Sequence, residues 1–410
     1  MMAGPRARPA DPMLVAVCAL GIGQITAWGT TYYVVGILAA PIVAGAGWSR
    51  SLVYFGFTVG MLAMAAVSPW AGRLIDRHGA RSVMTIGTLL VVLGLLALST
   101  ARSEAEYLAL WVFLGVGMRL TLYDAAFAAL VQVTPSRGRL AISYLTLFGA
   151  FASTVFWVIG HYLNEALGWR HTLIAFAVIH LAVCLPANWL GLARRDAPGS
   201  DSTPADTARA TRDGPPLSGR VRTVALVLFA LVMSLNGFVF GVMAVHLVPL
   251  LEAAGLTAAA AVWIASLKGC AQFGGRAVEI FFGRNLRAIT VARIALGVLP
   301  LSFIVLLLAH GKQSNWGAIL IFTLVMGASQ GVITIVRGAA PLALFGTQGY
   351  GAVLGLLATP IVVVNAAAPT IFALIVDYWG WQAAELALLG MAMASCIAME
   401  LMSCWYERRR

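Results

Sequence analysis

Long apolar stretches separated by short polar segments run along almost the whole chain. A bilayer core about 30 Å thick takes roughly 20 mostly apolar residues for each helical crossing. Twelve stretches reach this length, at about 13–40, 52–71, 82–100, 106–131, 141–163, 170–192, 223–250, 258–282, 289–309, 316–337, 350–376 and 382–404. The pattern therefore predicts an all-α membrane protein with twelve transmembrane helices.

Only the segment between the sixth and seventh stretches is plainly water-soluble. Residues 193–221 are rich in Pro, Gly, Ser, Thr and charged residues and show no apolar periodicity. Such a segment cannot bury enough surface to fold, so we expect a flexible linker. The chain is thus divided into an N-terminal six-helix bundle over 1–192, a cytoplasmic linker over 193–221 and a C-terminal six-helix bundle over 222–410.

The two halves resemble each other at two places. Residues 72–76 (GRLID) end the second stretch, and residues 275–279 (GRAVE) end the corresponding stretch of the second half. Residues 168–170 (GWR) are matched by residues 380–382 (GWQ) before the last stretch. The matches indicate a tandem duplication, and transporters built from repeated halves bind their substrate near the midplane, where the halves meet.

The composition excludes a water-soluble protein. Hydrophobic residues make up 60% of the chain and charged residues only 10%, whereas soluble domains carry about 25% charged residues. A soluble enzyme, a nucleic-acid-binding protein and a disordered protein are therefore excluded. The five cysteines all lie in apolar stretches without the spacing of a metal clip, so we expect no disulfide framework and no structural zinc. We also expect no cofactor.

The positive charges predict the orientation. If the N-terminus lies inside, the inner segments hold 21 of the 27 Lys and Arg residues and the outer loops hold 4. Because cytoplasmic loops carry the excess of Lys and Arg, both termini are expected in the cytoplasm. This topology also accounts for the net charge of +11 without a nucleic-acid partner.

Residues 72–81 (GRLIDRHGAR) resemble the loop signature G-x-L-x-D-R-x-G-R-R of the major facilitator superfamily, which lies between spans two and three. The matching positions are Gly72, Leu74, Asp76, Arg77, Gly79 and Arg81, while Ala80 departs from the signature. The resemblance implies a secondary transporter with two pseudo-symmetric bundles that rock about a central cavity. Since no nucleotide-binding motif is present, gradients rather than ATP would drive transport.

A narrower resemblance concerns residues 47–50 (GWSR) before the second span. This segment is similar to the monocarboxylate and oxalate–formate group of carriers. The glycine–proline signature of drug–proton antiporters in span five is absent, since residues 149–160 read GAFASTVFWVIG. A drug or metabolite exporter of the same superfamily nevertheless remains open as an alternative.

The loop signature also has a physical interpretation. Gly79 permits a tight turn, Asp76 can accept hydrogen bonds from the amide end of a neighbouring helix, and the arginines offer donors. We therefore predict a conformational latch at the cytoplasmic ends; the alternative is that these charges only set topology. The predicted latch comprises Gly72, Arg73, Asp76, Arg77, Gly79, Arg81, Asp124, Arg276 and Glu279, with Arg73 or Arg77 as the partner of Asp124.

Two cations lie near the midplane, Arg119 in span four and Lys268 in span eight. A cation at the bilayer centre costs about 2.5–3.5 kcal/mol on insertion scales, so it faces a cavity or a partner. In a continuous helix Asp124 is turned about 140° away from Arg119, and no acid lies within one turn of Lys268. Two uncompensated cations, one in each bundle, predict a small organic anion as the substrate. The alternative is that Arg119 pairs with Asp124, or Lys268 with another acid, to fix helix packing.

Other polar residues lie at similar depth. The predicted substrate-binding residues are Arg119, Lys268, Gln24, Tyr32, Tyr123, Asn236, Gln272 and Asn365. Glu279 and Asp124 are the carboxyls best placed for a coupling proton, but we favour a structural pair of Glu279 with Arg276.

Together these features predict a multi-pass secondary active transporter, not an enzyme, that moves a mono- or dicarboxylate by alternating access. Its expected partners are the anion, a coupling proton or counter-anion and the lipid bilayer, and the carrier is expected to be a monomer in a bacterial inner membrane. A non-transporting membrane sensor remains the alternative from a different class.

Overall fold

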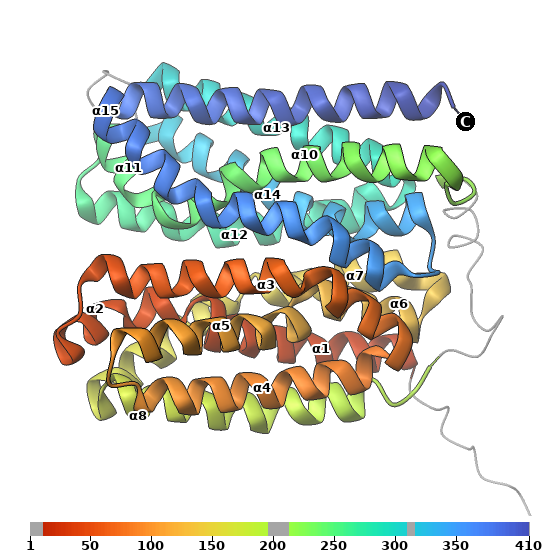
Figure 1. Ribbon diagram of the computed structural model, residues 1–410. Helices are drawn as coiled ribbons and strands as arrows, with labels where there is room; N and C mark the ends of the chain where they lie inside the picture. Colours follow the sequence, from red (N-terminus) through yellow and green to blue (C-terminus); the bar gives the residue numbers. More distant parts are fainter. Residues whose placement is uncertain (1–10, 196–212, 310–315, 410) are drawn as a thin grey trace, which may run out of the picture.

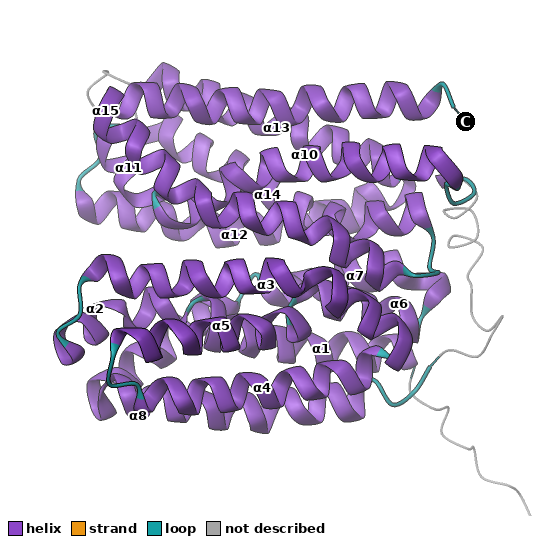
Figure 2. Ribbon diagram, viewed as in Figure 1, coloured by secondary structure: helices purple, strands orange, loops and turns teal. Residues whose placement is uncertain are grey.

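The computed structural model describes residues 11–195, 213–309 and 316–409. These residues form helices and connecting turns, and no strand occurs among them (Figure 2). The helices of the first half are α1 (Pro12–Ala27), η1 (Trp28–Tyr32), α2 (Val34–Ala46), α3 (Arg50–His78), α4 (Ala80–Thr100), α5 (Glu104–Thr121), α6 (Tyr123–Val133), η2 (Pro135–Arg137), α7 (Gly138–Gly149) and α8 (Ala152–Gly191). Those of the second half are α10 (Gly219–Val245), α11 (Leu247–Ala253), α12 (Ala258–Phe282), η3 (Gly283–Asn285), α13 (Ala288–Ala309), α14 (Trp316–Phe345) and α15 (Tyr350–Glu407).

Nine of the described helical segments are long and apolar enough to cross a membrane. Two of them contain a reversal of direction, because α8 is broken at Gly168 with φ 74° and α15 at Gly380 with φ 81°. The charged helix α12 is a further segment of spanning length, 25 residues. With both parts of α8 and α15 counted, the described chain is consistent with the twelve predicted spans, and the predicted all-α membrane fold is confirmed.

The helices are arranged in two bundles (Figure 1). Helices α1–α8 form one bundle around two clusters of buried apolar side chains, to which α15 also contributes, and α10–α15 form the other bundle around a third cluster. Most of the predicted linker, residues 196–212, lies outside the described residues. Helix α10 begins at Gly219, a few residues before the predicted end of the linker.

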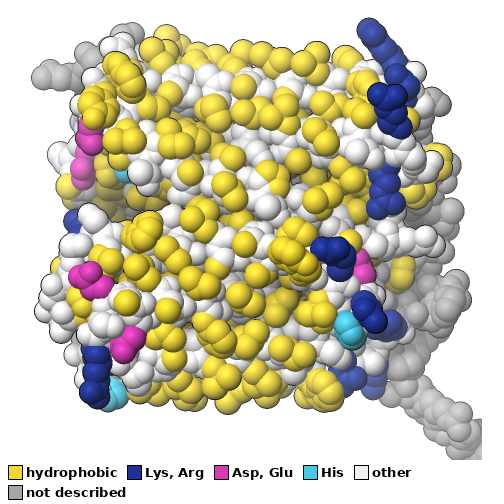
Figure 3. Space-filling model, viewed as in Figure 1, with side chains coloured by type: hydrophobic (Ala, Val, Ile, Leu, Met, Phe, Trp, Pro, Cys, Tyr) yellow, Lys and Arg dark blue, Asp and Glu magenta, His cyan; other side chains and the backbone are white. Residues whose placement is uncertain are grey.

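The first helix of each half begins, and the last helix of each half ends, at the same end of the molecule. Helix α1 begins there, and α3 and α15 end there (Figure 1). We call this the basic end, because Lys and Arg side chains gather along this edge, at the right of Figure 3. Elsewhere the visible surface is largely apolar, as expected for a surface in contact with lipid.

Helix α3 and the first part of α15 join the two bundles by close backbone contact. A Cβ atom placed on Gly72 would lie 2.1 Å from the carbonyl oxygen of Gly351, and one on Gly355 would lie 2.4 Å from that of Ser68. One turn further, the Thr359 hydroxyl donates to the carbonyl of Ala65 at 3.2 Å. Small residues are required here because larger ones would separate the helices.

The hydrogen bonds and ion pairs between the bundles gather in the half of the molecule toward the basic end. At the opposite edge, the left of Figure 3, the surface is hollowed between the two bundles. The described conformation is therefore closed at the basic end.

Candidate functional site

Arg119 and Asp124 form a buried ion pair, with 3.3 Å between Arg119 Nη1 and Asp124 Oδ2. The expectation that the two residues point apart was wrong, because it assumed a continuous helix over 106–131. Helix α5 ends at Thr121, Leu122 is extended with φ −77° and ψ −172°, and α6 begins at Tyr123. The break turns Asp124 back toward Arg119, so Arg119 is not an uncompensated cation.

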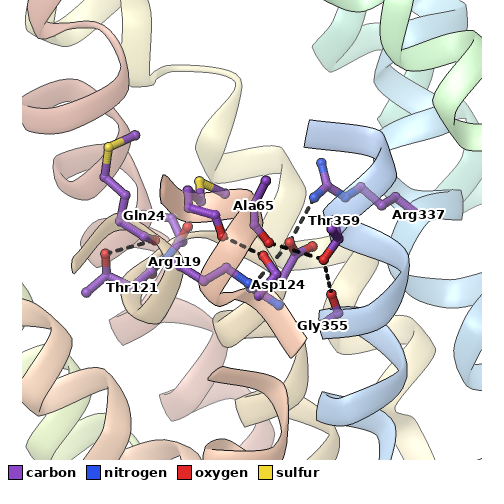
Figure 4. Close-up of polar contacts among 11 residues, drawn as sticks. Gln24, Ala65, Arg119, Thr121, Asp124, Arg337, Gly355 and Thr359 are labelled. Carbon is purple, nitrogen blue, oxygen red and sulfur yellow. Dashed lines mark hydrogen bonds and ion pairs between the residues drawn. The ribbon is translucent and has the colours of Figure 1, made fainter. Parts of the chain in front are cut away.

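Asp124 is shared with a second arginine from the other bundle. Arg337 Nη2 of α14 lies 2.8 Å from the same Oδ2 atom (Figure 4). The predicted partners of Asp124, Arg73 and Arg77, are exposed at the basic end instead. One carboxylate thus stands between two guanidinium groups, which leaves the cluster with one net positive charge.

Gln24 supports the helix break on which this cluster depends. Its Nε2 donates to the carbonyl of Thr121 at 2.7 Å, and its Oε1 accepts from Trp28 Nε1 at 3.2 Å. A carbonyl at a broken helix in the membrane interior needs such a donor because no lipid group can replace it. The side-chain amide of Gln24 is therefore engaged inside the N-terminal bundle (Figure 4).

Lys268 is the predicted cation for which the described residues supply no acidic partner. Its Nζ donates to the carbonyl of Met243 at 3.0 Å and lies 5.9 Å from the ring centroid of Phe240. Within residues 11–195, 213–309 and 316–409, no carboxylate lies within 4.0 Å of Nζ. Lys268 and Gln272, one turn further along α12, are both half-buried.

Arg276, two turns beyond Lys268, is buried and bonded to backbone carbonyls. Its Nε donates to Gly331 at 3.3 Å and its Nη1 donates to Thr146 of the N-terminal bundle. The preferred pairing of Glu279 with Arg276 was wrong. Glu279 instead accepts from Ser143 at 3.0 Å and lies 3.5 Å from Arg139, both in the N-terminal bundle.

The remaining predicted residues are divided between the bundles. Tyr32 and Tyr123 are half-buried and pack on Trp28, with ring centroids 4.9 and 5.1 Å away. Asn236 is buried and accepts from Gln330 at 3.2 Å within the C-terminal bundle. Asn365 is half-buried on α15.

The loop that carries the family signature contacts the other bundle through Asp76. Its carboxylate accepts from the backbone N–H groups of Gly351 at 2.9 Å and Ala352 at 2.7 Å. These groups lie in the first turn of α15, where the helix dipole favours a negative charge. This is the contact expected from the sequence, and Gly72 lies against Gly351 beside it.

The arginines of the loop do not reach the C-terminal bundle in the contacts described. Arg73 donates to Pro69 of its own helix at 3.1 Å, whereas Arg81 donates to Trp189 at 2.8 Å and stacks on its ring at 4.0 Å. Gly79 has φ 83°, a conformation that favours glycine, and joins α3 to α4. Only Gly72 and Asp76 of this segment therefore have described contacts across the interface.

We expect Asp76→Asn to weaken closure at the basic end, because hydrogen bonds to a charged acceptor contribute about 1.5–3 kcal/mol. Spin labels at the exposed positions His78 and Gln348, in a chain without its native cysteines, would move apart in a larger fraction of molecules. Asp377→Asn, a change at an exposed acid, serves as the control. An unchanged distance distribution and an unchanged transport rate would remove the latch hypothesis.

The comparison with known families matches this architecture. The model of the Major Facilitator Superfamily matches residues 20–310. The chain belongs to this superfamily. Three solved facilitators share its fold at 14–16% sequence identity.

The human organic anion transporter MFSD10 (TETRAN) has a TM-score of 0.71 at 16% identity, with 96% of this chain and 100% of that chain covered. The proton:xylose symporter XylE has a TM-score of 0.71 at 14% identity, covering 94% of both chains. FucP, solved in the outward conformation, has a TM-score of 0.70 at 15% identity, covering 96% and 99%.

Curated relatives match a shorter part of this facilitator. The multidrug resistance protein MdtL of Shigella flexneri serotype 5b is 26% identical over 170 residues, as is that of Escherichia coli K12. The match covers 41% of this chain and spans 43% of the length of those relatives. The solved and curated proteins are named as transporters or resistance proteins and none as an enzyme.

Sequence reasoning missed Arg337 and Arg139 as partners across the interface of this facilitator. Arg337 was placed at the end of a span over 316–337, but α14 continues to Phe345, which puts Arg337 inside the helix. An arginine followed by the apolar run Gly338–Phe345 was the available signal. No such sequence signal exists for Arg139, because its partner Glu279 is 140 residues away in sequence.

Proposed function

We propose that this facilitator moves a small organic anion, a mono- or dicarboxylate, by alternating access between its two bundles. The supporting observation is the excess of positive charge between them. Lys268 and Arg276 are bonded to backbone carbonyls, and Asp124 is shared by Arg119 and Arg337.

An anion would compensate this charge. A cation held at membrane depth without a carboxylate is costly, and its charge favours a negative ligand over a neutral or positive one. Guanidinium groups bind carboxylates in a bidentate manner, and the Lys268 ammonium provides a compact point charge. The fold is shared with a human organic anion transporter and equally with a proton:xylose symporter, so the proposed substrate class rests on the charge between the bundles.

The proposal includes the orientation. With the basic end in the cytoplasm, as the positive-inside rule requires, the described conformation opens to the opposite side of a bacterial inner membrane. The substrate class agrees with the resemblance of residues 47–50 to the monocarboxylate and oxalate–formate carriers.

Binding to the purified protein tests the proposal. Short mono- and dicarboxylates are expected to raise its thermal unfolding midpoint, because a ligand of the folded state stabilises it. Lys268→Ala is expected to weaken the binding of the best ligand by about 10- to 100-fold, since a hydrogen bond to a charged group contributes about 1.5–3 kcal/mol.

Two variants control for this effect. Lys268→Arg retains the charge and is expected to retain part of the affinity, and Arg102→Ala removes an exposed cation and is expected to leave binding unchanged. If Lys268→Ala bound the anion as tightly as the wild type, the role of Lys268 in the proposal would be lost.

The match to MdtL supports a second candidate, efflux of a drug or metabolite. Counterflow of labelled carboxylate in proteoliposomes distinguishes the two, since an anion carrier exchanges the label and a cation exporter does not. A non-transporting sensor would show no counterflow of any ligand. Uptake that ignores an imposed pH gradient would exclude proton symport and leave exchange with a counter-anion.

A further inference from the structure

A short π-helix in the first span gathers aromatic side chains on one face. In η1 the N–H of Tyr33 donates to the carbonyl of Trp28, five residues earlier, at 3.0 Å. The wider turn places both Tyr32 and Tyr33 beside Trp28, with ring centroids 4.9 and 6.4 Å away. In an α-helix a residue five positions on points about 140° away. Such π-turns are frequent at functional sites.

Tyr123 extends this aromatic surface from a second helix. Its ring centroid lies 5.1 Å from that of Trp28. A Cβ atom on Gly149 would lie 1.6 Å from its hydroxyl oxygen, so the glycine makes room for the tyrosine. The four side chains Trp28, Tyr32, Tyr33 and Tyr123 are called the aromatic surface below.

The aromatic surface differs from the aromatic packing inside the bundle. Tyr107 and Trp111, which also pair with each other, are 0% and 1% exposed. The four residues of the aromatic surface are all half-buried, although they lie inside membrane-spanning segments. Their rings thus remain partly open to a neighbouring molecule.

The aromatic surface lies beside cations of the C-terminal bundle. Arg337 Nη2 lies 2.8 Å from Oδ2 of Asp124, the residue that follows Tyr123. Arg276 donates to the carbonyl of Thr146, in the same helix as the Gly149 that makes room for Tyr123. Each guanidinium carries five N–H donors, more than the contacts described for it here. The aromatic surface of the N-terminal bundle therefore lies opposite cations of the C-terminal bundle.

We propose that the transported anion is an aryl carboxylate, with its ring against the aromatic surface and its carboxylate toward the cations of α12 and α14. This inference rests on the proposed function and narrows it. Aromatic pairs prefer offset or edge-to-face contacts at 4.5–7 Å. The rings of the aromatic surface lie 4.9–6.4 Å apart, with Tyr32 and Tyr33 edge-to-face and the pairs with Trp28 tilted. Aromatic cages also bind organic cations, but the positive charge opposite this one repels them.

The decisive comparison uses two acids of equal charge and similar size, benzoate and cyclohexanecarboxylate, titrated calorimetrically into the full-length protein. Benzoate is expected to bind about threefold to tenfold more tightly, as a stacked aromatic contact allows. Tyr32→Leu is expected to remove this preference, and Tyr32→Phe to keep it. Tyr162→Leu, at an exposed tyrosine of α8, is the matched control and is expected to keep it as well.

The outcomes separate the inference from the function on which it rests. Equal affinity for benzoate and cyclohexanecarboxylate in the wild type would overturn the aryl preference and leave the anion carrier intact. Binding of benzylamine as tight as that of benzoate, or no binding of any carboxylate, would overturn both. The comparison of benzoate with cyclohexanecarboxylate in the wild-type protein tests the aryl preference even if Tyr32→Leu does not fold.

Discussion

Replacing Asp124 by Asn is expected to destabilise the protein by about 3–5 kcal/mol, because it leaves the buried Arg119 and the half-buried Arg337 without their carboxylate. Arg119 is 1% exposed and its only described ion pair is with Asp124, which also holds Arg337 of the other bundle. The change should lower the thermal unfolding midpoint of the detergent-solubilised protein. It should also loosen the basic end, since the contact joins the two bundles.

A second substitution tests the cause. Arg119→Gln on the Asp124→Asn background removes one of the unpaired guanidinium groups and is expected to restore part of the lost stability. Asp377→Asn, at an exposed acid of α15, should leave the midpoint unchanged. If Asp124→Asn unfolds at the wild-type temperature, the shared carboxylate does not stabilise this conformation.

Gly72→Leu is expected to prevent closure at the basic end. The new Cβ atom alone would lie 2.1 Å from the carbonyl oxygen of Gly351, and neither backbone can yield without separating α3 from α15. With a cost of about 3 kcal/mol for a change of this kind, the closed conformation loses about 100-fold in relative population. Spin labels at His78 and Gln348 would report the longer distance in most molecules.

Gly297→Leu provides the matched control, because no atom beyond the neighbouring backbone of its own helix lies within 4 Å of the Cβ position, and Gly297 also lies within a membrane helix. Like Gly72→Leu, this variant replaces a helical glycine by a larger apolar residue. A Gly72→Leu protein with the wild-type distance distribution would contradict the described approach of α3 and α15.

The membrane helices could be predicted because hydropathy depends on local composition. The reversal at Gly168 was also predictable, since the same Gly-Trp pair recurs at Gly380 in the other half. Asp76 was placed correctly at a helix N-terminus because its contact follows from a signature with a known position between spans.

The charge pairs could not be predicted in the same way. The break at Leu122 carries no proline or glycine, so stepping along a regular helix put Asp124 on the wrong side of Arg119. The π-helical turn at Trp28–Tyr32 could not be predicted either, because no sequence pattern marks it. Pairs such as Arg139 with Glu279 depend on how the two bundles meet, which no local pattern records.

The reversals at Gly168 and Gly380 leave almost no chain between the helices that they join. Both glycines have φ near 80° and extended ψ, a backbone conformation open essentially to glycine alone. At the face of the membrane away from the basic end, these two hairpins therefore expose little backbone that a protease could cleave or an antibody could bind. A peptide tag inserted beside either glycine would break a helix pair.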